Sequence, residues 1–145
     1  REGREIYYAD HVEFDSQVQI RNWTGEHAPL HLVPSGLVFL AHMKTEEVDA
    51  YLDETLEART AQSEVDPVKI RQRLGQIRRV GYCWGYQEFA EGLNSVAAPV
   101  FNTRGDMIAA LHVHGPAYRF PDPEQTHDVG ILLNATCARM TLQLG

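Results

Sequence analysis

The chain has 145 residues, of which 43% are apolar and 23% charged, the proportions of a single globular domain. Thirteen Lys and Arg residues face 20 Asp and Glu residues, giving a formal net charge of −7, so we expect no nucleic-acid binding by this chain itself. No apolar run approaches the roughly 20 residues that span a bilayer and no signal peptide is evident, so we expect a cytoplasmic protein without membrane contact.

The first 50 residues predict an antiparallel ribbon followed by two helices. Residues 5–12 (EIYYADHV) and 17–23 (QVQIRNW) are rich in Ile, Tyr and Val and flank the turn-like EFDS, which predicts two paired strands. Residues 24–36 contain two prolines and two glycines and predict an irregular connection. Helices are then expected to begin with Ser35 and Thr45 as their caps.

The clearest helix covers residues 66–81. Asp66 is a suitable N-cap, Pro67 suits the first helical position, and Gly81 is expected to end the helix. The apolar residues recur at helical spacing. The buried face is therefore expected to consist of Ile70, Leu74 and Ile77.

Three strand-like runs and a long helix complete the chain. The runs are residues 80–86, 93–101 and 107–115, and NTRGD between the last two predicts a hairpin with Gly105 at positive φ. The final helix is expected to have Asp122 as its cap and Pro123 as its first residue. Because strands and helices occur in separate groups, the order favours an α+β fold, an antiparallel sheet with helices on at least one face.

Two histidines stand out in the last strand. His112 and His114 leave the same face, whereas alternation places four apolar residues on the other. Those four are Met107, Ala109, Leu111 and Val113. Both faces look covered, so the histidine face is expected to border a partly polar cavity.

Three roles are open for these imidazoles. They can satisfy carbonyls of a covering loop, donate hydrogen bonds to one carboxylate, or share a metal ion. The metal alternative needs a third ligand, for which His31 and Glu88 are the candidates.

A second candidate site is the Pro-Ser-Gly turn at residues 34–36. The first amides of a helix lack internal partners, so Ser35 and Gly36 can offer N–H groups to a small carboxylate, and the alternative is a simple N-cap. No catalytic motif accompanies it. Cys83 and Cys137 are too few and too far apart for a disulfide framework and are expected to be buried thiols.

Residues 78–116 resemble the C-terminal effector-binding domain of the IclR family of bacterial transcriptional regulators. YYADHVE and PLHLVPSGLVFLAHM resemble it too, so the likeness extends over nearly the whole chain. The positions that carry the resemblance are Gly81, Tyr82, Glu88, Glu91, Gly92, Ala97, Ala98, Pro99, Gly105, Gly115 and Pro116.

The resemblance implies a GAF-like α/β domain that binds a small organic or aromatic acid and uses no cofactor. A winged helix-turn-helix domain and a linker helix normally precede it, so we expect residues 1–145 to be one effector-binding domain that lacks its start, as the absent initiator Met also indicates. The DNA would be contacted only through the missing N-terminal domain. A homodimer or homotetramer without enzymatic activity is implied.

The family's pocket falls on the two candidate sites and the strands between them. By resemblance, its residues are Pro34, Ser35, Gly36, Gly85, Ser95, His112 and His114. Many members carry small hydroxyl residues in place of the histidines and an acidic or polar residue in place of Gly85. We therefore expect an anionic effector whose affinity weakens as pH rises from roughly 6 to 8. Extra room at Gly85 is expected, with Trp84, Tyr86 or Phe89 as an aromatic wall.

Two rival functions remain at this point. One is a metal-dependent enzyme that uses His112 and His114 as ligands. The other is a purely structural dimerisation module whose pocket stays empty.

Overall fold

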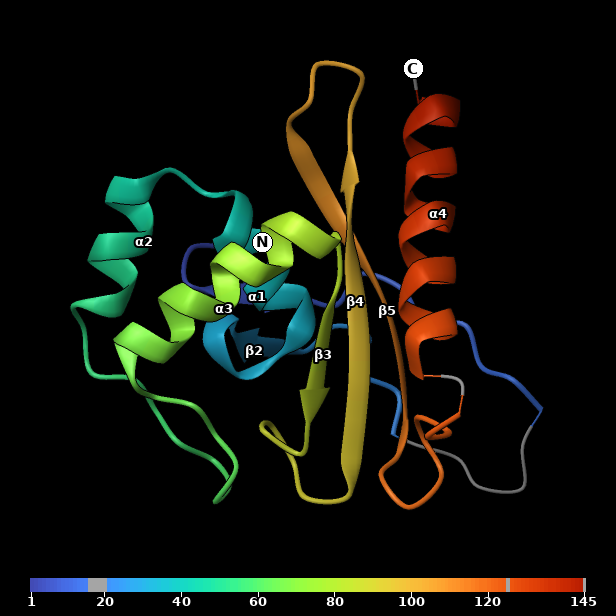
Figure 1. Ribbon diagram of the computed structural model, residues 1–145, viewed down its shortest axis with the longest axis horizontal. Coiled ribbons are helices and arrows are strands. Elements are labelled where there is room, and N and C mark those ends of the chain that lie inside the picture. Colours follow the sequence, from blue (N-terminus) through green and yellow to red (C-terminus); the bar gives the residue numbers. More distant parts are fainter. Residues whose placement is uncertain (16–20, 125, 145) are drawn as a thin grey trace.

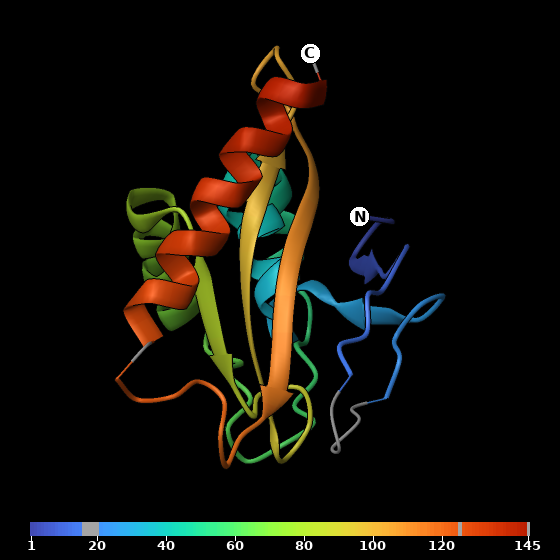
Figure 2. The same ribbon diagram turned by 90° about the vertical axis from the view of Figure 1, so that its right-hand side faces the viewer.

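The fold is a three-layer arrangement with a small sheet in the middle. The computed structural model describes residues 1–15, 21–124 and 126–144. Strands β3 (Cys83–Tyr86), β4 (Leu93–Phe101) and β5 (Met107–Pro116) form the central sheet. Helices α1 (Pro34–His42) and α3 (Pro67–Val80) cover one face, and α4 (Thr126–Leu144) covers the other (Figures 1 and 2). This confirms the expected α+β class.

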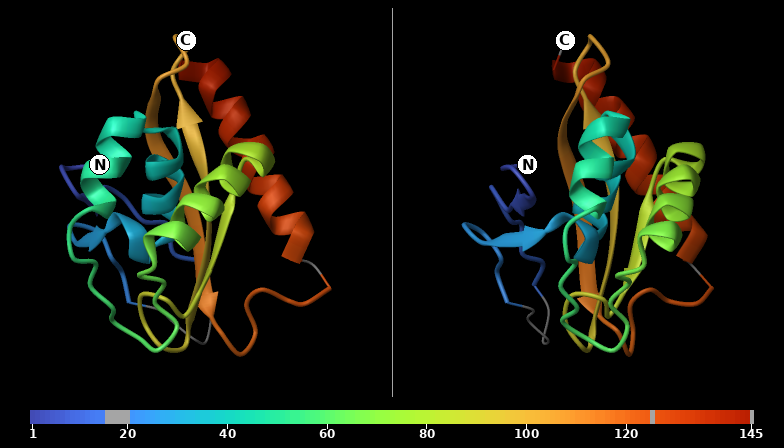
Figure 3. Two further views of the ribbon diagram at one scale, coloured as in Figure 1. Left: turned by 60° about the vertical axis from the view of Figure 1, so that its left-hand side comes forward. Right: turned by 90° about the vertical axis from the view of Figure 1, so that its left-hand side faces the viewer.

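The remaining elements lie on the α1 side of the sheet. They are strand β1 (Glu5–Tyr7), strand β2 (His27–Pro29), the short 3-10 helix η1 (Leu30–Leu32) and helix α2 (Thr45–Leu52). Figure 3 shows the two-stranded ribbon of β1 and β2 beside α1, at a distance from α4. None of the helices in the described parts of the chain is both long and apolar enough to cross a membrane.

The central sheet is fully antiparallel in the order β3-β4-β5. Gly105 has φ 85° in the β4–β5 connection, which confirms the predicted hairpin. Strand β5 lies at the edge: its outer side pairs with no strand among residues 1–15, 21–124 and 126–144. All three strand-like runs of the second half are therefore confirmed.

Helix α3 follows its local signals. The Asp66 carboxylate accepts a hydrogen bond from the Val68 N–H at 2.9 Å, Pro67 is the first helical residue, and Gly81 ends the helix with φ 86°. A left-handed residue is the usual helix terminator, and glycine adopts that conformation without steric cost. The expected face, Ile70, Leu74 and Ile77, is buried.

Two apolar clusters hold the layers together, one on each face of the sheet. The larger lies between α1, α2, α3 and the sheet and includes Leu37, Leu40 and Leu74. The smaller joins the sheet to α4 through Val96, Val100 and other residues on both sides. Leu133 and Cys137 are the buried members from α4.

The ribbon differs from the prediction. Strand β1 pairs with β2, inside the stretch expected to be irregular, with Ile6 opposite Ala28. Residues 17–20 of the expected second strand lie outside the described residues, and 21–23 form no strand. Ala28 is fully buried, so packing of this Pro-flanked residue outweighs the local turn signals.

Three helix starts also differ. Helix α1 begins at Pro34 with Val33 as its N-cap and no side-chain cap, so Ser35 lies within the helix. Helix α2 has Lys44, not Thr45, at the N-cap position. Helix α4 begins at Thr126 rather than Pro123. The Asp122 carboxylate instead accepts a hydrogen bond from the Glu124 N–H in a turn before the helix.

A β-bulge alters one face of β5. The register shifts between Val100, opposite Ala109, and Phe101, opposite Met107. Since a one-residue insertion moves a side chain to the other face, Met107 packs on the α1 side with Ala110, not with Leu111 as alternation predicted. The histidines lie beyond the bulge and keep the predicted face.

Candidate functional site

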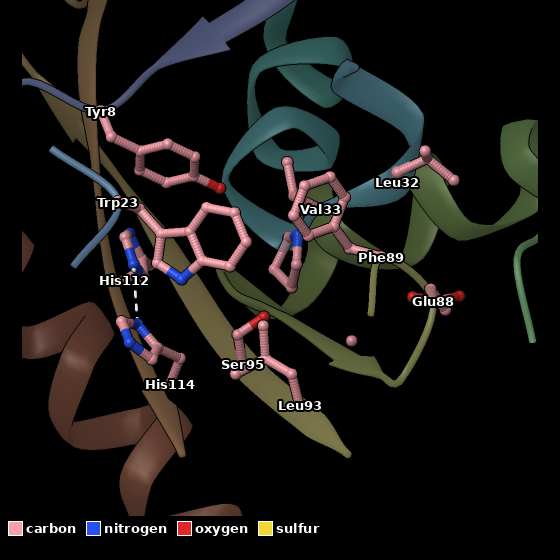
Figure 4. A pocket seen from close by; sticks show the side chains of 12 residues that line it. Tyr8, Trp23, Leu32, Val33, Glu88, Phe89, Leu93, Ser95, His112 and His114 are labelled. Carbon is pink, nitrogen blue, oxygen red and sulfur yellow. Dashed lines mark hydrogen bonds between the residues drawn. The ribbon is translucent and has the colours of Figure 1, made fainter. Parts of the chain in front are cut away.

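A small cavity lies between the beginning of α1 and the histidine face of β5. Its volume is about 30 Å³, room for about two water molecules. Figure 4 shows side chains from the ribbon, from α1 and from all three central strands converging on it. The lining residues are Tyr8, Trp23, Leu32, Val33, Pro34, Gly85, Glu88, Phe89, Leu93, Ser95, His112 and His114.

The register of the sheet builds one wall of this cavity. Gly85 on β3 pairs with Ser95 on β4, which pairs with His114 on β5, so the three residues form one row across the sheet. His112 follows two residues earlier on the same face and pairs with Ala97. The sheet therefore places together four of the seven residues expected from the sequence.

His112 and His114 form a contacting pair. His112 Nε2 lies 3.1 Å from His114 Nδ1, and the rings stack with centroids 5.2 Å apart. The His11 ring stacks on His114 at 5.6 Å, and the Tyr8 ring meets His112 edge to face at 5.1 Å. A hydrogen bond between two imidazole nitrogens needs one protonated and one bare nitrogen, so the geometry suits a pair in which at least one ring is neutral.

Burial favours the neutral state of both rings. Burial, together with the nearby His114 and His11, lowers the pKa of His112 to about 4. Burial, and then His11, also lowers the pKa of His114. At neutral pH the cavity thus presents uncharged imidazoles, which can gain a proton when an anion arrives.

The beginning of α1 contributes less than expected. Pro34 lines the cavity, whereas Ser35 and Gly36 are not among the lining residues. Ser35 is buried, and its side chain is hydrogen-bonded to Tyr8. Burial raises the pKa of the Tyr8 hydroxyl, and this hydrogen bond offsets part of the rise. A Cβ on Gly36 would lie 2.2 Å from the Leu30 carbonyl oxygen, so Gly36 serves close packing of α1 on η1.

The expectation of extra room at Gly85 is corrected by the structure. A Cβ at this position would lie 2.7 Å from Cγ of Pro34 and 3.3 Å from a Glu88 carboxylate oxygen. The absent side chain is thus replaced by the Pro34 ring. An acidic group is also present after all, because Glu88 lines the cavity from the turn after β3.

Arg73 neutralises this acidic group. Its guanidinium donates to both Glu88 carboxylate oxygens, at 2.6 and 2.9 Å, and also to the Trp84 carbonyl oxygen at 2.5 Å. The two side chains are only 22% and 12% exposed. The cavity floor therefore carries a compensated ion pair and not a free negative charge.

The aromatic wall is made of residues other than those expected. Phe89 lines the cavity, but Trp84 stacks on Tyr86 at 5.9 Å and packs with the α4 cluster, outside the cavity. Tyr8 and Trp23 also line the cavity, and neither was expected there from the sequence. Both come from the N-terminal ribbon and its connection, and no local pattern indicates that these segments fold over the sheet formed by residues 83–116.

The third ligand that the metal alternative required is not present. His31 is buried away from the cavity, where its Nε2 donates to the Glu57 carbonyl oxygen and its Nδ1 accepts from the Tyr51 hydroxyl, both at 2.8 Å. Among the residues that the structure describes, no three His, Cys, Asp or Glu side chains are placed to hold a metal ion.

The two cysteines are buried free thiols, as predicted. Burial raises the pKa of Cys83 to about 11, and burial also raises the pKa of Cys137. Neither thiol lines the cavity.

Known proteins match the chain over nearly its whole length. The family model described as "Bacterial transcriptional regulator IclR C-terminal" matches residues 1–140. The transcriptional repressor AllR of Klebsiella pneumoniae is 30% identical over 146 residues, which cover 100% of this chain and 53% of that protein. The chain thus spans about half the length of this relative.

Solved structures agree. A putative IclR transcriptional regulator from Silicibacter sp. TM1040 superposes with a TM-score of 0.92 at 28% identity, covering 100% of this chain and 57% of that one. The inducer-binding domain of the transcription factor PobR from Acinetobacter, a double mutant solved with 3-hydroxybenzoic acid, has a TM-score of 0.77 at 25% identity, covering 88% and 74%. The chain therefore belongs to the C-terminal domain family of the bacterial IclR transcriptional regulators.

Proposed function

We propose that this chain is the effector-binding and oligomerising domain of a cytoplasmic transcriptional regulator, and that it binds a small organic or aromatic acid in the cavity between α1 and β5. It is a sensor and not an enzyme. Residues 1–145 act as one domain, and DNA is bound through an N-terminal helix-turn-helix domain of the complete protein. Effector binding shifts the arrangement of subunits in a homodimer or homotetramer and thereby the affinity for DNA.

One observation carries this proposal. In a chain of this family, the cavity brings Pro34, Gly85, Ser95, His112 and His114 together from four separate elements. Pockets that collect a few polar groups within an apolar lining are typical small-molecule sites. The acid bound to the inducer-binding domain of PobR supports an organic acid as the ligand class.

The cavity must open for such a ligand. A volume of about 30 Å³ is filled by about two water molecules, far less than an aromatic acid occupies. The ring of Trp23 and the ring of Phe89, which contact at 5.2 Å, take up the space opposite the sheet. An effector therefore shifts this aromatic pair outward on entry while the Trp23 ring keeps its N–H toward the sheet, which makes the ligand-bound state differ from the closed one.

A bound anion also changes the protonation of the histidine pair. A contacting carboxylate raises the pKa of an imidazole, so the pKa of His112, about 4 in this structure, rises when an anion is bound. Binding then takes up a proton at pH values between the pKa of the free state and that of the complex. The lowered pKa of His112 supports a window of weakening affinity that begins at lower pH than the range of roughly 6 to 8 expected from the sequence.

A thermal screen with the purified protein tests the proposal. Mono- and dicarboxylates of two to eight carbons, with 3-hydroxybenzoate among them, are added at increasing concentration, and an acid present at 100 times its Kd stabilises the fold by about 2.7 kcal/mol. Each stabilising acid is then titrated into the complete regulator on its operator. An empty screen would favour the structural dimerisation module, and binding without any change in operator affinity would remove the sensing role.

A further inference from the structure

Trp23 presents a hydrogen-bond donor to the cavity that no described protein atom accepts. Its indole nitrogen, Nε1, is buried and has no hydrogen-bond partner within residues 1–15, 21–124 and 126–144. Figure 4 shows the nitrogen-bearing edge of the ring turned toward the side of the cavity formed by Ser95, His112 and His114. Because buried donors in folded proteins are nearly always paired, this one indicates an acceptor that comes with a ligand.

Packing holds the indole in this orientation. The ring meets Phe89 edge to face, with centroids 5.2 Å apart and an interplanar angle of 64°, and Tyr8 lies at 6.5 Å. The Arg21 guanidinium covers the indole at 5.1 Å from the ring centroid. With neighbours on several sides, the ring cannot turn its N–H to solvent without losing these contacts.

The second tryptophan shows that an unpaired indole is not enough by itself. Trp84 Nε1 is also buried and has no partner in the part of the chain that the structure describes, but Trp84 packs between Tyr86 and Phe120 on the opposite face of the sheet and does not line this cavity. Of these two described indoles, Trp23 alone combines a missing acceptor with a place in the lining of this cavity. The chain has two tryptophans in all, so Trp84 provides a matched control.

We propose that the Trp23 indole N–H donates a hydrogen bond to an anionic oxygen of the effector, which makes Trp23 a specificity-determining residue of the site. The inference rests on the proposed function of this cavity. The sheet holds one side of the ligand through Ser95 and the histidines, and Trp23 holds the other side from the segment before β2. A ligand that lacks an oxygen acceptor on this side leaves the donor unpaired and is rejected.

The indole N–H resonance measures this bond directly. In Trp84→Phe, Trp23 is the single tryptophan, and its ¹H–¹⁵N indole signal is followed while 3-hydroxybenzoate, or a carboxylate that stabilises the protein more, is added to saturation. A hydrogen bond to a carboxylate moves the indole proton downfield. A saturated complex in which this resonance stays in place or moves upfield would overturn the inference.

Affinity provides a second measurement. Trp23→Phe keeps an aromatic ring against Phe89 but removes the N–H, and because a hydrogen bond to a charged group is among the stronger ones, Kd should rise about tenfold or more. Trp84→Phe should leave Kd within about twofold of the parent. Should Trp23→Phe fold poorly, the indole resonance of the Trp84→Phe protein decides.

The outcomes separate this inference from the function on which it rests. Equal affinity of Trp23→Phe and the parent protein would overturn the role of the indole while leaving the effector site intact. Failure of the parent protein to bind any carboxylate would overturn the proposed function and the inference together.

Discussion

Lowering the pH from 6.5 toward 4 should destabilise this fold through His112, at pH values where most carboxylates are still ionised. Burial, together with the neighbouring His114 and His11, lowers the pKa of His112 from 6.5 to about 4. The unfolded chain therefore binds a proton at this residue between pH 6.5 and 4 that the folded protein does not bind. Stability rises with pH wherever the unfolded state holds more protons, so the full contribution is present above pH 6.5 and is lost toward pH 4.

The size of the effect follows from the same values. The interval from 6.5 to about 4 corresponds to a loss of about 3 kcal/mol when the titration is complete. At pH 5 the unfolded residue is almost fully protonated and the folded one is not, so about 2 kcal/mol of this loss is already present. His114, whose pKa is lowered in the same direction, adds to the effect.

Urea denaturation at several pH values between 8 and 5 tests this reasoning. His112→Gln keeps a polar side chain of similar size but does not titrate, so its stability should fall by about 2 kcal/mol less than that of the parent between pH 8 and pH 5. His42→Gln, a change at the exposed end of α1, should retain the fall of the parent. Parallel curves for the parent and His112→Gln would refute the argument, because the histidine would then be free to ionise in the folded protein.

Three further expectations follow from the site. Gly85→Ala should lower the free energy of unfolding by about 1 to 3 kcal/mol in urea denaturation, because the new Cβ meets Pro34. Gly75→Ala on α3 is the control: its new Cβ would lie 3.8 Å from an Arg78 side-chain nitrogen, an ordinary contact, and the change should raise the free energy of unfolding by up to about 1 kcal/mol. Arg73→Gln should destabilise by about 2 to 3 kcal/mol by leaving the Glu88 carboxylate unpaired, and the double variant with Glu88→Gln should regain part of this, which a double-mutant cycle measures. Calorimetric Kd values for a bound carboxylate should increase between pH 5 and pH 7 as the histidine pair loses its extra proton, and a constant Kd would mean that the pair does not respond to ligand charge.

Elements with local signals could be predicted from the sequence. The cap and the stop of α3, Asp66 and Gly81, act within a few residues, and the alternation of β5 places His112 and His114 on one face. These patterns depend on backbone geometry, which neighbouring residues determine. The family likeness added the strand neighbours, such as Ser95 beside His114, that alternation alone does not provide.

Features that depend on distant packing could not be predicted in this way. The bulge at Met107 and the pairing of β1 with β2 are decided by which side chains find room in the core. Trp23 enters the site only because the N-terminal connection folds over β5, and Pro34 fills the space beside Gly85 only because α1 packs closely on β3. A single sequence carries no short-range signal for contacts between such remote segments.

Strand β5 has no strand neighbour on its outer edge among the residues that the structure describes, and this edge can affect how the domain behaves in solution. Residues 107–116 contain no Lys, Arg, Asp or Glu, although charged side chains are a common means by which proteins keep sheet margins from joining. These ten residues form an edge strand without charged side chains, and an extended peptide can pair with such an edge as one more strand. Concentrated samples should therefore associate through pairing of their β5 edges. The substitution Ile108→Lys, at a residue that is 48% exposed, should keep them monodisperse.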